Sequence, residues 1–488
     1  MSFWDIVFRA VFGSRGPRSP GTSRSTVPGT ASPTRPAPPP VSPPPSETTM
    51  APEPSPPTAS PPVNPQPSQT STTPPAPPLT QPAVTSVEQP LGSTPTIELG
   101  CVDADISDAN CAAFLSEVER TTRVALADIR DTPDKVVTKR LAPMPSGAMS
   151  IAQVQQALAA IGFFPSGRVD GICGYRTQSA IRLFQEFVRT AENQDIVPDG
   201  KFGPRTAAHL QRWVNSGQRP DWRQRPGEYE AWLGLLERVK ENYIAEPGPL
   251  TQKVNAFQGA SDTLKPADWD TSGPGNIHLI GVRRSQFTNK FDDIFVLLMK
   301  GLVFKFQGST EPGHSSHPEG PPFLVPGQHK YHFGWHQRSY LALRPQGPGV
   351  LVIRGGADGR LDLADIDKPL TPNATINIHW GGRGMAGDVN NWSEGCQVIN
   401  GSVYLNPAGE IVNCQSFAAV RSGEPQTPGS GKTRGAYNLL VDLVTALSGD
   451  MQSNTVRYTL LKEPDLVLAP ELEQGLNAAR ASVVDMAT

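Results

Sequence analysis

The stretch that decides the C-terminal fold is residues 375–399, TINIHWGGRGMAGDVNNWSEGCQVI. It opens as an alternating β-branched strand that ends near His379, and it returns to a strand just after Cys396. The glycine-rich segment between these two residues predicts a loop. We therefore expect a histidine and a cysteine at two strand ends that face one loop.

A histidine and a cysteine in this setting are suited to thiol chemistry. A thiol nucleophile needs an imidazole to accept its proton and a backbone N–H to stabilise an oxyanion. We assign these roles to His379 and Cys396, and we expect Gly395, which lacks a Cβ, to let substrate approach the backbone beside the sulfur. Ser393 would orient either His379 or the loop. Taken singly, Cys396 is more simply a buried thiol, and His379 is more simply a polar side chain whose hydrogen bonds are satisfied.

This run resembles the active-site signature of the L,D-transpeptidases of bacterial cell walls, in which His-Gly is followed downstream by Ser-x-Gly-Cys. Here Cys396 follows His379 by seventeen positions. The resemblance implies a β-rich catalytic domain, a thioester intermediate and no cofactor. The sequence departs from the signature in two places, because Trp380 follows His379 and Gln397-Val398 replaces a hydrophobic residue and an arginine. These departures suggest a divergent branch with a different acyl acceptor.

Seven more residues near this stretch are candidates for substrate contact. They are Trp380, Gly381, Gly382, Trp392, Gln397, His332 and His336. The two tryptophans would shield a thioester from water or merely pack. The histidines between residues 314 and 336 show no His-Glu-x-x-His spacing, so we predict structural roles and no metal.

Residues 146–217 contain a duplicated turn-helix pattern. The sequence VDGICGYRT at 169–177 recurs as PDGKFGPRT at 198–206, and a helical pattern follows each copy. This repeated pattern resembles the three-helix type of peptidoglycan-binding domain. The resemblance implies a binding module with no catalytic groups. Asp170 and Asp199 are predicted to be turn residues, because Asx side chains bond their own backbone in such turns.

The N-terminal segment has the composition of a tether. Of the 52 prolines, 26 lie between Pro17 and Pro95, in a Ser/Thr-rich run nearly free of charge. The first fifteen residues are hydrophobic, but Asp5 and Arg9 interrupt them, so no obvious Sec signal is present. This stretch is predicted to dock on a secretion or delivery apparatus, or to be a hydrophobic leader. The net charge of -3 gives no support for nucleic-acid binding.

The expected fold class is multidomain α+β, with a helical bundle and a C-terminal β-rich sandwich or barrel. The predicted domains are the tether 1–96, a helical connector 97–145, the peptidoglycan-binding module 146–217, a helical linker 222–270 and the catalytic domain 271–488. In the connector, Ser107 or Asp108 would cap a helix, and Cys101 and Cys111 could pair if the compartment is oxidising.

We thus predict a cysteine acyltransferase that acts on peptidoglycan stem peptides in the cell wall, periplasm or extracellular space. Two alternatives remain open. A hydrolase or delivered wall-targeting toxin would use the same Cys396 and His379, whereas a structural protein would keep only the binding module and bury Cys396. Alkylation of Cys396 at neutral pH would be fast for an activated thiolate and slow for a buried thiol.

Overall fold

The computed structural model describes residues 95–129, 134–164, 167–284, 289–313, 315, 317–356, 359–382, 388–419, 433–448 and 455–466. The chain divides into two units, 1–85 and 86–488, and every described residue belongs to the second. The predicted tether up to residue 94, His314 and a helix predicted at 470–484 lie outside the described residues.

The connector contains one helix and a small sheet. Strands β1 (Cys101–Val102) and β2 (Lys139–Arg140) pair in parallel, and the helix α2 spans Asp108–Thr122. Ser107 caps α2 by accepting a hydrogen bond from the Asn110 N–H. Cys101 and Cys111 are both free thiols, and Cys101 is buried. The suggested disulfide is therefore not formed.

The module at 146–217 is a three-helix unit, as predicted. Its helices are α3 (Ile151–Ala160), α4 (Tyr175–Ala191) and α5 (Pro204–Ser216). They close around a cluster of edge-to-face and tilted aromatic rings formed by Phe163, Phe184, Phe187 and Trp213. Because these rings are buried, they form a core and not a sugar-stacking surface.

Each copy of the repeated turn is held by a buried glutamine. Gln155 Nε2 donates to Asp170 Oδ1 and Thr177 Oγ1, and its Oε1 accepts from the N–H groups of Asp170 and Gly171. In the second copy Gln185 makes the matching contacts with Asp199, Thr206 and Gly200. Each aspartate also accepts from the backbone N–H two residues further on. The predicted turn role of Asp170 and Asp199 is confirmed.

The C-terminal part is a closed β-barrel. Its eight strands, in spatial order, are β11 (Ile378–Trp380), β8 (Tyr340–Pro345), β7 (Gly327–His336), β14 (Val456–Lys462), β3 (Ile277–Arg283), β4 (Asp293–Met299), β5 (Leu302–Ser309) and β12 (Gln397–Leu405). The parallel pairing of β11 with β12 closes the ring. The prediction of a β-rich sandwich or barrel is thereby resolved in favour of the barrel.

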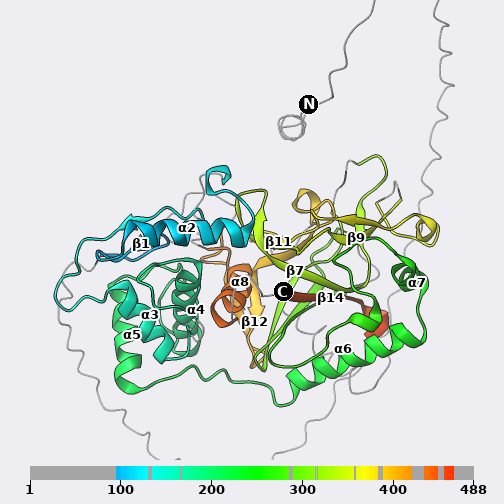
Figure 1. Cartoon of the computed structure of the whole chain (residues 1–488). Coiled ribbons are helices and arrows are strands. Elements are labelled where there is room, and N and C mark those ends of the chain that lie inside the picture. The colour runs from blue at the N-terminus through cyan, green and yellow to red at the C-terminus, as the bar shows by residue number, and fades with distance from the viewer. Residues whose placement is uncertain are drawn as a thin grey trace, which may run out of the picture. The chain divides into compact units, whose positions relative to one another are not determined.

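The remaining described elements surround this barrel (Figure 1). Strand β13 (Ile411–Asn413) extends β12, and β6 (Pro322–Leu324), β9 (Val350–Arg354) and β10 (Thr371–Asn373) form a separate small sheet. The helices are α6 (Glu228–Ala245) and α7 (Pro249–Ala256) in the predicted linker, and α8 (Ala436–Leu447). Short 3-10 turns occur at Leu126–Asp128, Pro266–Asp268, Asp365–Asp367, Asn390–Trp392 and Glu463–Leu466. None of the helices in the described ranges has the length and apolar character needed to cross a membrane.

The module and the barrel share an interface. Helix α8 packs between α4 and β12. At this interface Arg182 Nη1 lies 3.0 Å from Asp442 Oδ1, and the Tyr404 hydroxyl donates to Glu186 Oε1 at 2.6 Å. Both the Arg182 and Asp442 side chains are almost fully buried. The module is therefore docked on the barrel through charged as well as apolar contacts.

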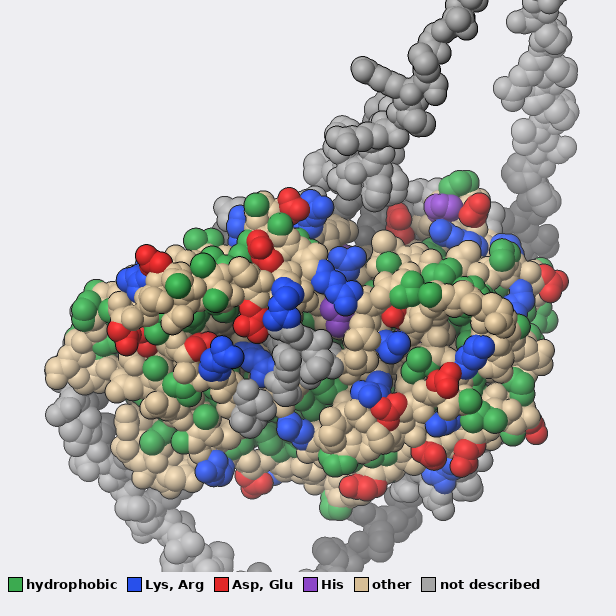
Figure 2. Space-filling model, viewed as in Figure 1, with side chains coloured by type: hydrophobic (Ala, Val, Ile, Leu, Met, Phe, Trp, Pro, Cys, Tyr) green, Lys and Arg blue, Asp and Glu red, His purple; other side chains and the backbone are tan. Residues whose placement is uncertain are grey.

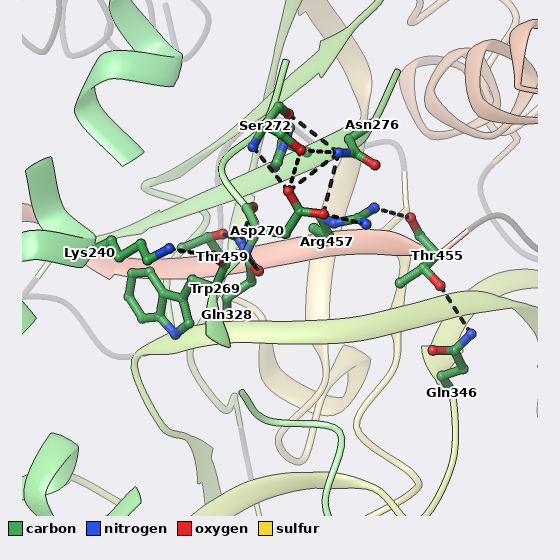
Figure 3. Close-up of polar contacts among 11 residues, drawn as sticks. Lys240, Trp269, Asp270, Ser272, Asn276, Gln328, Gln346, Thr455, Arg457 and Thr459 are labelled. Carbon is green, nitrogen blue, oxygen red and sulfur yellow. Dashed lines mark hydrogen bonds and ion pairs between the residues drawn. The ribbon is translucent and has the colours of Figure 1, made fainter. Parts of the chain in front are cut away.

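A polar cluster around Asp270 ties the segment before β3 to β14 (Figure 3). The Asp270 carboxylate accepts hydrogen bonds from Ser272 and Asn276 and forms an ion pair with Arg457 at 2.5 Å. Partial burial opposes ionisation, but the Ser272 and Arg457 contacts outweigh it and hold the pKa of Asp270 below its usual value. The cluster satisfies its own hydrogen bonds, so we read it as structural.

Candidate functional site

The predicted nucleophile and base lie at the seam that closes the barrel. Ile378 of β11 is opposite Gln397 of β12, so the preceding residues Asn377 and Cys396 are also neighbours across the two strands. Paired residues of adjacent strands point to the same face, and successive residues alternate. Asn377, His379 and Cys396 consequently share one face of the sheet.

The Cys396 thiol is partly exposed and bonded to the backbone of the β11 entry. Its Sγ donates to the Thr375 carbonyl at 3.3 Å and accepts from the Asn377 N–H at 3.4 Å. Burial raises the thiol pKa to about 11, although the Asn377 N–H and the Arg344 charge oppose this rise. The resting thiol is therefore neutral at pH 7.

The His379 imidazole is oriented as a base. Its Nδ1 lies 2.9 Å from the Trp380 carbonyl, which can only accept, so Nδ1 carries the proton. The Tyr340 hydroxyl lies 3.3 Å from the same nitrogen. The other nitrogen, Nε2, is buried and has no hydrogen-bond partner among the described residues. Burial lowers the pKa of His379 to about 4, so Nε2 keeps a free lone pair at neutral pH.

The thiol and the imidazole are diagonal neighbours on the seam. One strand spacing across and two residues along place their Cα atoms about 8 Å apart, within reach of a cysteine and a histidine side chain. Among the described contacts there is no hydrogen bond between Sγ and either ring nitrogen, because the thiol bonds to Thr375 and Asn377 instead. Such contacts are often long before substrate binds.

Ser393 and Gly395 hold the turn that presents the cysteine. The buried Ser393 hydroxyl donates to the Cys396 carbonyl at 2.7 Å and accepts from the Gly395 N–H at 2.9 Å. Of the two roles considered for Ser393, the contacts favour orienting the loop. The Gly395 N–H is occupied by Ser393 and is therefore not free to stabilise an oxyanion. The Cys396 N–H makes no hydrogen bond within the described chain.

The reason for glycine at 395 also differs from the prediction. A Cβ there would lie 2.6 Å from Pro322 Cγ and 2.7 Å from the Pro322 carbonyl oxygen, which is too close for any side chain. Gly395 thus lets β6 pack against the cysteine turn, and the close approach that it permits is made by the protein's own backbone.

Two of the predicted histidines lie on the face that carries the thiol. The rings of His336 and His379 stack with centroids 4.1 Å apart, and Asn377 Nδ2 donates to His336 Nδ1 at 3.1 Å. His332 lies four residues before His336 on β7, opposite Arg344. Burial lowers the pKa of both histidines, to about 4 for His332, with nearby arginine charges acting in the same direction.

The other substrate-contact candidates are placed less favourably. Gln397 is fully buried on the opposite face, where its Oε1 accepts from the Tyr458 hydroxyl, so its side chain is directed away from the thiol. Trp380 is also fully buried, beneath Trp392 and Arg434. The expectation that these two side chains touch substrate is corrected by strand alternation, which turns Gln397 inward, and by this packing.

The rest of the glycine-rich loop joins β11 to its surroundings. Gly381 N–H donates to the Ile399 carbonyl, and the Gly382 carbonyl accepts from Gly401, so both glycines continue the strand pairing. Trp392 is 37% exposed and packs edge-on against Trp380, with an angle of 65° between the ring planes. It is therefore the one predicted tryptophan that a substrate could meet. Residues 383–387 of the predicted loop lie outside the described residues.

Three residues of the site were not found from the sequence. Tyr340 contacts the His379 ring, Asn377 links the thiol to His336, and Arg344 contributes a positive charge near the sulfur. Asn377 stands two positions before the histidine in the motif, and this period-2 spacing is a signal that it shares the histidine's face. Tyr340 and Arg344 come from a distant hairpin and carry no such local signal.

The neutral thiol leads to a pH prediction. It also means that slow alkylation at neutral pH does not identify a silent protein here, because a nucleophile that loses its proton only as it attacks is also neutral at rest. Alkylation of Cys396 by iodoacetamide should be slow at pH 7 and should rise about tenfold per pH unit up to pH 10, because only the thiolate reacts and its pKa is about 11. Mass spectrometry of the Cys396 peptide measures the rate separately from the other thiols. A plateau already reached by pH 8 would instead indicate a resting thiolate stabilised by an imidazolium.

Comparison with known proteins bears on the helical module. Residues 149–210 match the family model described as a putative peptidoglycan binding domain. The chain carries a peptidoglycan-binding domain. That domain makes peptidoglycan its partner and suggests association with the cell wall. The match covers α3, α4 and the first half of α5, and it does not extend to the barrel.

Two other comparisons add little to this assignment. No curated protein matches the chain. A solved structure, a fused Zn-dependent amidase/peptidase/peptidoglycan-binding domain-containing protein from Clostridium acetobutylicum ATCC 824, is 13% identical with a TM-score of 0.18. The similarity covers 51% of this chain and 85% of that one. A TM-score this low gives no information on the barrel or its chemistry.

Proposed function

We propose that the chain is a peptidoglycan-targeted cysteine acyltransferase of the L,D-transpeptidase-like kind, with Cys396 as nucleophile and His379 as general base. The observation that supports this most is the parallel pairing of β11 with β12, which puts the two side chains on one face. The peptidoglycan-binding domain, docked on the same barrel, supports stem peptides as the substrate.

In the first half-reaction the Cys396 thiol passes its proton to His379 Nε2 as the sulfur attacks a peptide carbonyl carbon. The Nδ1–H bond to the Trp380 carbonyl fixes the ring and stabilises the imidazolium that forms. The Cys396 N–H is the available donor for the oxyanion. Collapse of the tetrahedral intermediate breaks the C–N bond, the leaving amine takes the proton from Nε2, and a thioester remains.

In the second half-reaction an amine acceptor attacks the thioester and gives its proton to His379 Nε2. The new amide is released and the sulfur recovers the proton, so the enzyme returns to its starting state. With water as acceptor the same steps give a carboxylic acid, which is the hydrolase alternative. Trp392, partly exposed at the seam, would limit the access of water to the thioester.

The test is mass spectrometry of muropeptides after incubation of sacculi with the full chain or with Cys396→Ala, with and without an added amine acceptor. The wild type should give new crosslinked or exchanged products that depend on the acceptor, and the variant should give none. Products of simple cleavage would favour the hydrolase. Identical digests from both proteins would contradict catalysis and leave a peptidoglycan-binding structural protein.

A further inference from the structure

A row of polar side chains crosses the seam beside the thiol. Arg344 of β8 is the neighbour of Asn377, since Leu343 pairs with Ile378 in the antiparallel β8–β11 ladder. Asn377 is in turn the neighbour of Cys396 across β11–β12. Residues in cross-strand register share a face, so Arg344, Asn377 and Cys396 form one line, with about 10 Å between its outer Cα atoms.

The Arg344 guanidinium is held between β7 and the entry of β11, and its charge acts on the sulfur. Its Nη1 donates to the Trp335 carbonyl at 3.0 Å, and Nη2 lies 3.5 Å from the Ala374 carbonyl. The next carbonyl along the chain, that of Thr375, accepts from the Cys396 thiol. The guanidinium and the sulfur are therefore held at consecutive peptide groups of one strand entry.

Within the described residues, Arg344 has no acidic partner. Its hydrogen bonds go to backbone carbonyls, and it takes part in none of the ion pairs found there. It is only partly exposed. A partly buried guanidinium that bonds two neutral oxygens keeps its positive charge. It also has further N–H donors that a ligand can use. The acidic group that acts on Cys396 is Glu394, which is itself exposed to solvent.

A histidine and a second arginine lie beside Arg344. His332 is opposite Arg344 and is uncharged at pH 7, since its pKa is about 4, and among the described residues its buried Nδ1 has no hydrogen-bond partner. Arg123, which follows α2, lies close enough to His332 for its charge to act on that ring, as does the charge of Arg344. Figure 2 shows Lys and Arg side chains gathered beside a histidine near the middle of the face drawn there.

Arg123 belongs to the connector and yet is fixed on the barrel. It caps α2 in the left-handed conformation with φ 56°, a position where glycine is favoured, and its Nη1 donates to the Gln346 carbonyl just after β8. A non-glycine residue held in this conformation is locally strained. The contact with Gln346 orders a second guanidinium on the same side of the barrel as Arg344.

We propose that Arg344, flanked by Arg123 and His332, forms an anion subsite that holds a free carboxylate of the peptide acyl donor while its scissile carbonyl lies at Cys396. This rests on the proposed acyl transfer. The carboxylate would be that of the departing amino acid, one residue beyond the bond that breaks, and arginine pairs with such a group in a bidentate geometry.

The first test uses two small thiol reagents and needs no peptidoglycan. Iodoacetate and iodoacetamide alkylate the same sulfur, but only iodoacetate carries a carboxylate. The ratio of the iodoacetate rate to the iodoacetamide rate at Cys396 therefore reports binding of an anion beside the thiol. Both reagents react with the thiolate, so the fraction of thiolate cancels in this ratio. Arg344→Met should lower this ratio about fivefold, the factor expected for one unit charge near 4 Å in water. Added salt should lower the wild-type ratio in the same direction.

Arg338→Met is the matched control, because Arg338 lies in the β7–β8 turn, is exposed, and is paired with Asp128 outside this line. It should leave the ratio unchanged. Arg344→Lys keeps the charge and should retain most of the preference for iodoacetate. An unchanged ratio in Arg344→Met would overturn the proposal, and so would an equal fall in Arg338→Met, which would indicate only the general field of the protein.

The second test asks whether the anion is the donor's own carboxylate. A stem peptide with a free C-terminus should be processed by the wild type at least about fivefold faster than its C-terminal carboxamide, and Arg344→Met should abolish this difference. Equal use of both peptides would overturn the assignment of the carboxylate. If neither peptide reacts but the iodoacetate preference depends on Arg344, the acyl-transfer proposal fails while the anion subsite stands.

Discussion

Replacing His379 by Gln should lower the turnover of stem peptides by about 10²–10⁴-fold, the range for loss of a general base. The glutamine amide can still donate to the Trp380 carbonyl, so the loop conformation is expected to persist. What disappears is the basic nitrogen at the position of Nε2, which is buried and has no partner within the part of the chain that the structure describes. Muropeptide formation measured by mass spectrometry gives the rate.

His336→Gln is the matched control for this experiment. His336 stacks on His379 and accepts from Asn377, but it has no contact with the thiol among the described hydrogen bonds. We expect its loss to cost less than about tenfold, through a looser His379 ring. Equal effects of the two substitutions would contradict the assignment of His379 as the base and would point to a shared structural role.

The pH profile gives an independent readout. Because burial lowers the pKa of His379 to about 4, the base stays unprotonated above that pH and is lost only below it. The acid limb of kcat/KM should therefore have its midpoint near pH 4. An acid limb near pH 6.5, the ordinary histidine value, would show that the imidazole is solvated in the working enzyme.

Local sequence patterns predicted the parts of this protein that depend on local geometry. The two Asp-Gly turns behave as expected because each aspartate bonds the backbone two residues on, within its own loop. The C-terminal part, predicted to be β-rich, forms strands that lie in the barrel and in the small separate sheet. The strand placed at His379 and the strand after Cys396 are likewise present as β11 and β12.

Features that depend on register and packing could not be predicted in this way. Gln397 follows the cysteine in sequence but faces the opposite side of the sheet, where it meets Tyr458 of a strand about sixty residues away. Gly395 was expected to make room for substrate, yet the space beside it is filled by Pro322. Arg344 reaches the site only because β8 pairs with β11, a contact between segments that are distant in sequence.

The second large effect concerns the interface between module and barrel. Arg182→Met should lower the free energy of unfolding by about 3 kcal/mol, because it leaves the Asp442 carboxylate buried without its cation. Asp442 is 1% exposed, and burial raises its pKa to about 7 despite the opposing charge and hydrogen bond of Arg182. Partial protonation of the carboxyl at neutral pH keeps the cost at the lower end of the range for broken buried pairs.

Urea denaturation of the full chain, followed by tryptophan fluorescence, measures this change. Arg205→Met is the control, since Arg205 and Asp195 are both exposed and lie 3.9 Å apart, and such a surface pair contributes at most about 1 kcal/mol. Adding Asp442→Leu to Arg182→Met should restore most of the stability, because an apolar pair needs no desolvated charge. Failure of the double variant to recover would mean that Arg182 acts through packing and not through the carboxylate.

The urea unfolding transition of the full chain should also change shape in Arg182→Met. Helix α8 packs against both α4 and β12, so module and barrel should unfold together in the wild type. Loss of the buried pair weakens that interface, and a separate, earlier transition of the module should then appear. With the module uncoupled, the barrel should react with soluble stem peptides at the wild-type rate but with intact sacculi more slowly than the wild type. The reason is that the peptidoglycan-binding domain would no longer hold the polymer at a fixed position relative to Cys396. Equal losses on both substrates would contradict this separation of binding from chemistry.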